Sequence, residues 1–193
     1  MLGTQIISKG LDFDNVDLVG VINADSELYF SDFRASEKAF QILTQVSGRC
    51  GRGDKRGLAI IQTNSIDNKV IQYAAKQDYN SFYLEEMKYR KQLNYPPFSF
   101  ISSFIISGFN KDALYKYCMF IKDSIYEMDE NKELVVLGPT EPFLSSKSNS
   151  FKYRFILKYK NKDYAYKILN QIKDLIVVSK FNVKFDTNPY QNL

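Results

Sequence analysis

The sequence predicts a mixed α/β protein built in two parts, residues 1–95 and residues 96–193. Three observations lead to this fold class. Short, continuous apolar runs in the first part are typical of buried strands in a parallel sheet. Apolar residues at helical spacing separate those runs, which predicts a parallel α/β layer. After two adjacent prolines, the pattern changes to strand, helix, strand, strand, helix, strand.

The first part opens its predicted sheet at residues 18–22, where a continuous apolar run predicts a strand covered on both faces. Asp25 follows this strand, at an edge where a carboxylate is well placed to bind a ligand. Ser36 is a capping candidate for a helix that ends near Gly48. Residues 57–62 then predict a second buried strand. The layer is expected to be incomplete, because no βα units precede its first strand.

Two further helices are expected near residues 69–77 and 78–93. In the second of them, Glu85 and Lys88 are spaced as an ion pair on one helix face. Pro96 and the proline after it end this helix, because proline cannot continue a helix and restricts the residue before it. The sequence therefore predicts a domain boundary after residue 95.

The second part has the order βαββαβ, which is typical of a split-βαβ, ferredoxin-like α+β domain. Its expected elements are strands at residues 100–106, 133–139, 151–160 and 183–186, with helices at residues 111–128 and 163–177.

One strand of the second part has a basic face. Within residues 151–160, aromatic and aliphatic side chains occupy the odd positions, whereas Lys152, Arg154, Lys158 and Lys160 occupy even positions. Residues 1–95 carry 12 basic and 12 acidic side chains, but residues 96–193 carry 14 and 10. Clustered positive charge suits a phosphate backbone, so nucleic acid is a candidate ligand. A merely solvated strand face is the alternative.

Several classes of protein are excluded by composition. The chain has no His, and Cys50 and Cys118 lack CxxC spacing, so neither a zinc site nor a His-based triad is expected within it, and no metal ligand is predicted. No apolar run approaches the roughly 18 residues of a membrane span, and the N-terminus does not resemble a signal peptide. We expect a cytoplasmic protein with no membrane partner.

The strongest functional candidate is the segment from Gln45 to Arg52, which contains Arg49 and two glycines. Guanidinium groups are permanently charged and present a planar fork of donors that matches phosphate oxygens. Two arginines three residues apart therefore predict a polyphosphate site. A structural salt-bridge pair is the alternative.

The order of several motifs resembles one helicase family. Residues 3–13 resemble helicase motif V, and residues 45–52 resemble motif VI of superfamily 2. Residues 32–37 look like a segment typical of the PriA family of primosomal replication-restart helicases. Residues 95–98 and 136–139 are similar to the C-terminal domain of that family. The resemblance implies a partial RecA-like parallel α/β helicase lobe followed by the family's C-terminal domain.

The resemblance also implies a role for each motif. The whole enzyme would be an ATP-dependent 3′ to 5′ DNA helicase that recognises stalled or D-loop forks and restarts replication by primosome assembly. Arginines of the second lobe stabilise the charge of the transferred phosphoryl group when the two lobes close. The implied catalytic residues are Arg49 and Arg52, the nucleotide-binding residues are Gln45, Gly48, Gly10 and Asp12, and the DNA-binding residues are Thr4, Gln5 and Lys9. Asp12 as a turn carboxylate and Lys9 as a solvated side chain are the alternatives.

Other parts of such an enzyme are missing from this sequence. There is no phosphate-binding loop and no acidic pair to hold magnesium, so this chain alone is predicted to be inactive. ATP and Mg²⁺ are expected only in the full-length protein, and zinc in a segment outside this chain. Implied partners are branched DNA forks, a single-stranded-DNA-binding protein, and primosome and helicase-loader proteins. The alternative is a stand-alone nucleic-acid or protein binding module without catalysis.

Overall fold

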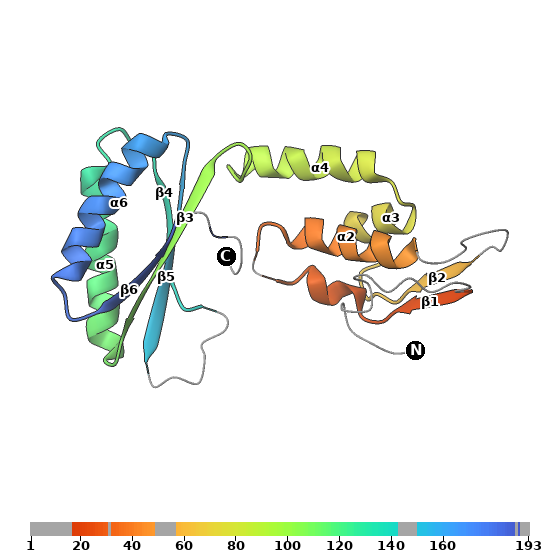
Figure 1. Ribbon diagram of the computed structural model, residues 1–193, viewed down its shortest axis with the longest axis horizontal. Coiled ribbons are helices and arrows are strands. Elements are labelled where there is room, and N and C mark those ends of the chain that lie inside the picture. The colour runs from red at the N-terminus through yellow and green to blue at the C-terminus, as the bar shows by residue number, and fades with distance from the viewer. Residues whose placement is uncertain (1–16, 31, 49–56, 143–149, 188, 190–193) are drawn as a thin grey trace. The chain divides into compact units, whose positions relative to one another are not determined.

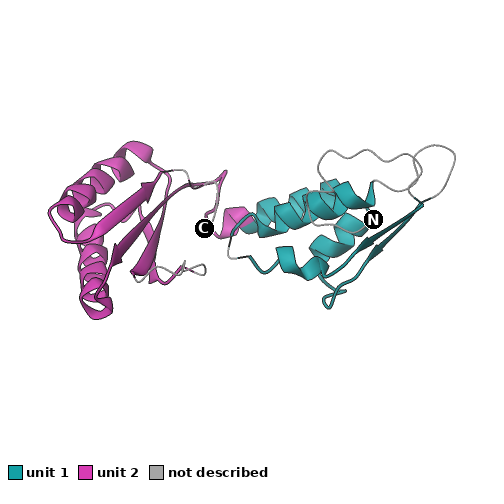
Figure 2. Ribbon diagram, turned by 60° about the horizontal axis from the view of Figure 1, so that its bottom comes forward, with its two compact units in different colours: residues 1–89 teal, residues 90–193 magenta. Residues whose placement is uncertain are grey.

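The structure, a computed structural model, describes residues 17–30, 32–48, 57–142, 150–187 and 189. The chain divides into two compact units, Met1–Tyr89 and Arg90–Leu193 (Figure 2). This division falls inside a helix, six residues before the boundary placed after residue 95. Mixed α/β architecture with two separate sheets agrees with the predicted fold class at that level.

The first unit contains a two-stranded parallel sheet, in which Leu18 pairs with Leu58 and Val21 with Ile61. The parallel pairing predicted from the two apolar runs is thus confirmed. The elements of this unit are β1 (Leu18–Val21), the 3₁₀ helix η1 (Ala24–Glu27), α2 (Ala35–Ser47), β2 (Leu58–Ile61), α3 (Lys69–Ala75) and α4 (Tyr79–Gln92), the last of which continues into the second unit.

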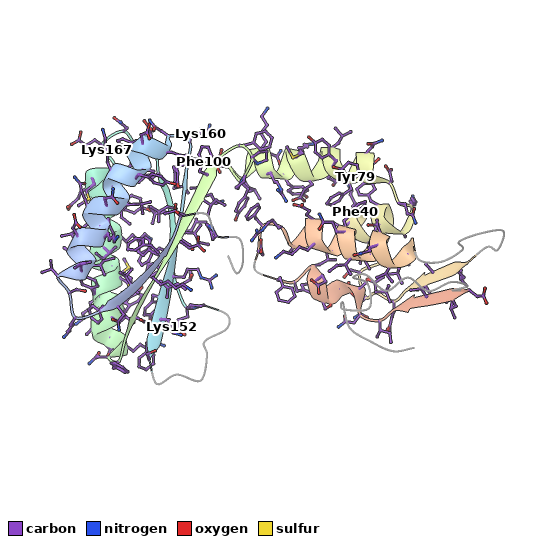
Figure 3. All side chains as sticks on the ribbon, viewed as in Figure 1. Phe40, Tyr79, Phe100, Lys152, Lys160 and Lys167 are labelled. Carbon is purple, nitrogen blue, oxygen red and sulfur yellow. The ribbon has the colours of Figure 1, made fainter. Side chains whose placement is uncertain are left out.

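The helices of the first unit share one core. Phe40 of α2 stacks on Phe82 of α4 with ring centroids 4.2 Å apart, and Phe40 also contacts Tyr79 (Figure 3). Leu43 and Ile71 are buried in the same cluster, against which the sheet packs its partly buried side chains. One face of the sheet formed by β1 and β2 is therefore buried against these helices.

The other face of this sheet is exposed, which corrects the prediction of strands covered on both faces. Leu18 is 59% exposed, Leu58 58% and Ile60 52%. A continuous apolar run indicates burial on both faces only if a layer covers each face. Among the described residues, the cluster of helices covers one face of this sheet.

Contacts between α3 and α4 replace one ion pair that the sequence predicted within α4. Asn68 caps α3, because its side chain accepts a hydrogen bond from the backbone N–H of Val70. Glu85 of α4 pairs with Lys69 at 2.9 Å and accepts a hydrogen bond from the Tyr73 hydroxyl at 2.7 Å, rather than pairing with Lys88 as predicted. Tertiary contact between the helices outweighs the weak pair along one helix.

The second unit is an antiparallel four-stranded sheet with the strand order β4-β5-β3-β6. Helices α5 and α6 lie on the same side of this sheet (Figure 1). The predicted order of elements is confirmed, with bounds β3 (Phe100–Gly108), α5 (Lys111–Met128), β4 (Val135–Thr140), β5 (Phe151–Tyr159), α6 (Lys162–Val177) and β6 (Asn182–Asp186).

Alternate residues of the strands build the core against these helices. Phe104 of β3 stacks on Phe155 of β5 with centroids 4.7 Å apart and contacts Phe185 of β6. Cys118 is fully buried in the same cluster, and burial raises the pKa of its thiol to about 12. Both helices begin at an asparagine cap, Asn110 for α5 and the corresponding Asn at the start of α6.

A glycine shapes the irregular end of β4. The pairing of β4 with β5 shifts register between Leu137 and Thr140, which marks a bulge. Gly138 lies in this bulge with φ of 111°, and a Cβ there would be 2.5 Å from the carbonyl oxygen of Arg154. Both the backbone angle and the close approach of β5 require glycine.

Candidate nucleotide and nucleic-acid sites

The structure describes two of the nine residues implied by the helicase motifs. Gln45 and Gly48 lie at the C-terminal end of α2, and both are exposed. The other seven lie outside the described residues: Thr4, Gln5, Lys9, Gly10, Asp12, Arg49 and Arg52.

The last turn of α2 determines what the described part of the nucleotide motif can do. The Gly48 N–H donates to the Thr44 carbonyl oxygen at 2.9 Å, and the Ser47 hydroxyl donates to the Leu43 carbonyl oxygen at 2.6 Å. Gly48 has φ of −71°, so its conformation is open to other residues. A helix C-terminus carries partial negative charge, which disfavours phosphate. Anion binding at this end would therefore need the positive side chains that follow in the sequence.

The other end of α2 is held by a cluster of charged groups. Asp32 accepts hydrogen bonds from the backbone and the guanidinium of Arg34 at 2.9–3.0 Å, and from the Lys38 ammonium at 2.9 Å. Burial alone would raise the pKa of Asp32, but these hydrogen bonds outweigh it and hold the pKa at about 2. The carboxylate thus fixes the chain where it enters α2.

Asp25, placed by the sequence at a ligand-binding strand edge, has a structural partner for each carboxylate oxygen. One oxygen accepts from the Thr63 hydroxyl and the other from the Asn64 N–H, both at 2.8 Å. The Asn64 N–H, together with the Thr63 hydroxyl, holds the pKa of Asp25 below its ordinary value despite burial. Asp25 therefore ties the segment after β1 to the segment after β2.

In the second unit, the predicted alternation of β5 is present. Tyr153, Phe155 and Leu157 are buried in the core with α5 and α6. Lys152 and Arg154 lie on the opposite face, and both are half-buried. Burial lowers the pKa of the Arg154 guanidinium, which remains charged at neutral pH. The face of the sheet without helices is thus the basic one.

Lys158 does not belong to an accessible basic surface, which corrects its assignment as a DNA-binding residue. It is 7% exposed, and its ammonium donates to the Leu93 carbonyl oxygen at 3.0 Å. The same ammonium lies 3.4 Å from the centroid of the Tyr95 ring. Burial lowers the pKa of Lys158. Its contacts join β5 to the segment that follows α4.

The fold adds a basic residue that the sequence analysis missed. Lys184 of β6 is exposed and lies opposite Ile105 of β3, which on its other side lies opposite Arg154. Residues directly opposite one another share a face of the sheet. The alternation within residues 182–186 indicates that Lys184 lies on one face of its strand. Only the pairing of this last strand with the first strand of the sheet shows that this face is the basic one.

The described residues contain no group of three His, Cys, Asp or Glu side chains that could hold a metal ion. Within the same ranges, no helix is both long and apolar enough to cross a membrane.

Known proteins resemble the chain over nearly all of its length. Residues 91–190 match the family described as the primosomal protein N C-terminal domain. Proteins named replication restart protein PriA are 37% identical over 196 residues in Bacillus subtilis, 36% over 193 in Rickettsia typhi and 35% over 191 in Borreliella burgdorferi. These alignments cover 98% of this chain and 24%, 29% and 29% of the respective relatives. The chain spans about a quarter of the length of these relatives.

Among solved structures, the de novo designed protein Foldit4 matches 48% of this chain and 99% of its own length, with 8% identity and a TM-score of 0.38. This similarity is too low to support an inference.

Proposed function

The chain belongs to the PriA family of replication restart proteins, and on that basis we propose that it is the C-terminal portion of an ATP-dependent 3′ to 5′ DNA helicase. The whole protein would recognise stalled or D-loop forks and restart replication by primosome assembly. The observation that carries this proposal is 34–37% identity to PriA proteins over almost the entire chain. ATP and Mg²⁺ would be ligands of the longer protein, and zinc a ligand of a segment outside this chain.

The first unit would be the last part of a RecA-like lobe. Parallel pairing of β1 with β2, with η1 and α2 as the crossover, supports this assignment. In such a lobe, α2 would lead directly into Arg49 and Arg52. The ion-pair cluster at Asp32 would fix the start of that helix, and Gln45 would lie beside the nucleotide.

The second unit would be the ferredoxin-like C-terminal domain and would contact DNA. The element order βαββαβ and a sheet in which β3 lies between β5 and β6 support this description. Lys152 and Arg154, on the face without helices, would contact the DNA fork. A single-stranded-DNA-binding protein, primosome proteins and helicase loaders would be further partners.

The nucleotide role is tested in the longer protein. Arg49→Ala and Arg52→Ala should each abolish DNA-stimulated ATP hydrolysis and leave fork binding intact, because an arginine finger contributes on the order of 10³ to 10⁵ in rate. Gln41→Ala, on the exposed surface of the same helix, is the control and should keep full turnover. Unchanged turnover in both arginine variants would refute the assignment.

The reading frame upstream separates the helicase from a stand-alone binding module. A phosphate-binding loop and a cysteine-rich insertion before residue 1 are expected for the helicase. A gene that lacks both would instead support a module that binds nucleic acid or protein without catalysis.

A further inference from the structure

The face of the second sheet that α5 and α6 leave uncovered carries three cationic side chains on two strands, with a third strand between them. Arg154 of β5 and Lys184 of β6 both lie opposite Ile105 of β3. Lys152 of β5 lies opposite Ser107 of β3, one step along the same face. We propose that Lys152, Arg154 and Lys184 form one cationic patch that binds the phosphate backbone of duplex DNA without reading its sequence. This inference rests on the proposed DNA-binding function of the chain.

The spacing of the patch suits a polyphosphate. Alternate residues of one strand are about 7 Å apart, and strands separated by one neighbour are about 10 Å apart. A duplex carries one negative charge per roughly 1.7 Å of helix axis, so a patch of this size faces several phosphates. Three long cationic side chains on a rigid sheet can therefore neutralise more than one of them.

The neighbouring side chains favour backbone contact. Asn182 of β6 lies opposite Ser107, so small polar groups lie beside Lys152 at this end of the sheet, and Ile105 lies between Arg154 and Lys184. Asp186 lies on the same face, opposite Ser103, and is an acidic group close to Lys184. The patch thus retains net positive charge with donors suited to phosphate oxygens.

The aromatic side chains of these strands point to the other face. Phe104, Tyr153 and Phe155 are buried against the helices, and Phe185 is packed on the same core. Proteins that hold single strands use exposed aromatic rings on which bases stack. The β3 residues directly opposite the patch, Ile105 and Ser107, carry no aromatic ring, and the exposed Phe109 follows the end of β3. This arrangement favours a duplex arm of a fork over its unpaired strand.

The test uses the 193-residue chain and fluorescence anisotropy with a labelled duplex, a second duplex of unrelated sequence, and one separated strand. Lys184→Ala should weaken duplex binding about three- to tenfold at 100 mM salt and reduce the slope of log affinity against log salt by about 1. Both duplexes should bind equally, and the single strand no more tightly.

Lys167→Ala is the matched control, because Lys167 is an exposed lysine on α6, on the side of the sheet that the helices cover (Figure 3). It should leave affinity and salt slope unchanged, whereas Lys184→Arg should retain binding. Asp186→Asn should strengthen duplex binding about two- to threefold, a gain that a folding defect would not produce.

The outcomes separate this inference from the function on which it rests. If the unaltered chain binds DNA but Lys184→Ala behaves as Lys167→Ala does, the patch is wrong and the DNA-binding function stands. Tighter binding to the single strand, or discrimination between the two duplexes, also overturns the patch. If the unaltered chain binds no DNA at 50 mM salt, the proposed DNA-binding function itself fails.

Discussion

Substitution of Lys158 tests whether this side chain of β5 stabilises the fold or binds DNA. The structure places it in packing contacts and not on an accessible surface. Replacement by Met keeps an apolar side chain of similar length and removes the ammonium. The substitution removes the hydrogen bond to the Leu93 carbonyl and the contact with the Tyr95 ring. It also removes the cost of burying the charge, which is the reason that burial lowers the pKa of Lys158.

The expected magnitude follows from these opposing effects. A hydrogen bond from a charged group contributes roughly 1.5 to 3 kcal/mol, and a desolvated cation–π contact about 1 to 2 kcal/mol. Relief of the desolvation cost offsets about half of this sum. We expect Lys158→Met to lower the free energy of unfolding by about 1.5 kcal/mol, with the Leu93 carbonyl left without its donor.

Urea unfolding of the second unit measures this change, and the midpoint should fall by about 1 M. Lys160→Met is the matched control, because Lys160 directly follows the end of β5 and is exposed. It should shift the midpoint by less than about 0.3 M. Affinity of Lys158→Met for duplex DNA should equal that of the unaltered chain. Equal midpoints for the two variants, or a loss of DNA binding in folded Lys158→Met, would refute the reasoning.

Three further predictions concern other features of the fold. Asp32 has a pKa depressed from 3.8 to about 2, so its stabilising effect is complete above about pH 4.5 and is lost as the pH falls toward 2. Asp32→Asn should cost about 1 kcal/mol at pH 7, allowing for solvent screening, and only a small part of that at pH 2, as measured by urea unfolding at both pH values. Gly138→Ala should lower the free energy of unfolding by about 2 to 4 kcal/mol, whereas Gly20→Ala, where a Cβ meets nothing within 4 Å, should have little effect; equal thermal shifts would contradict this. In a Cys50→Ser background, the buried Cys118 thiol should react with a disulfide reagent at pH 8 only as the unit unfolds. The reason is that a pKa of about 12 leaves roughly 10⁻⁴ of this thiol as thiolate. Full reaction on mixing would count against burial.

Local patterns predicted most elements of both units. The alternation in residues 151–160 assigned Tyr153 and Phe155 to the core, because a strand has only two faces and the charged side chains occupy the other one. Two prolines and a run of helical spacing likewise placed the end of α4 close to its observed position at Gln92. These predictions succeeded because each depends on the geometry of a single element.

The same patterns could not tell which surfaces remain open. Leu18 and Ile60 are as apolar as buried strand residues, yet they are exposed, because burial depends on a second layer and not on the strand itself. Asp25 follows β1, within η1, but its two partners come from the segment after β2, nearly 40 residues away. Contacts of this range are invisible to periodicity.

The sequence by itself determined the family, the order of elements and the two faces of β5, since motifs and side-chain alternation are properties of contiguous residues. Only the tertiary structure decided how the basic residues are used. Lys152, Arg154 and Lys158 all lie at even positions of one strand, but the segment after α4 covers Lys158, and β6 brings Lys184 to the same face as the other two. Whether a charged side chain is a ligand-binding group or part of the packing depends on which distant segment folds against it, and no local pattern contains that information.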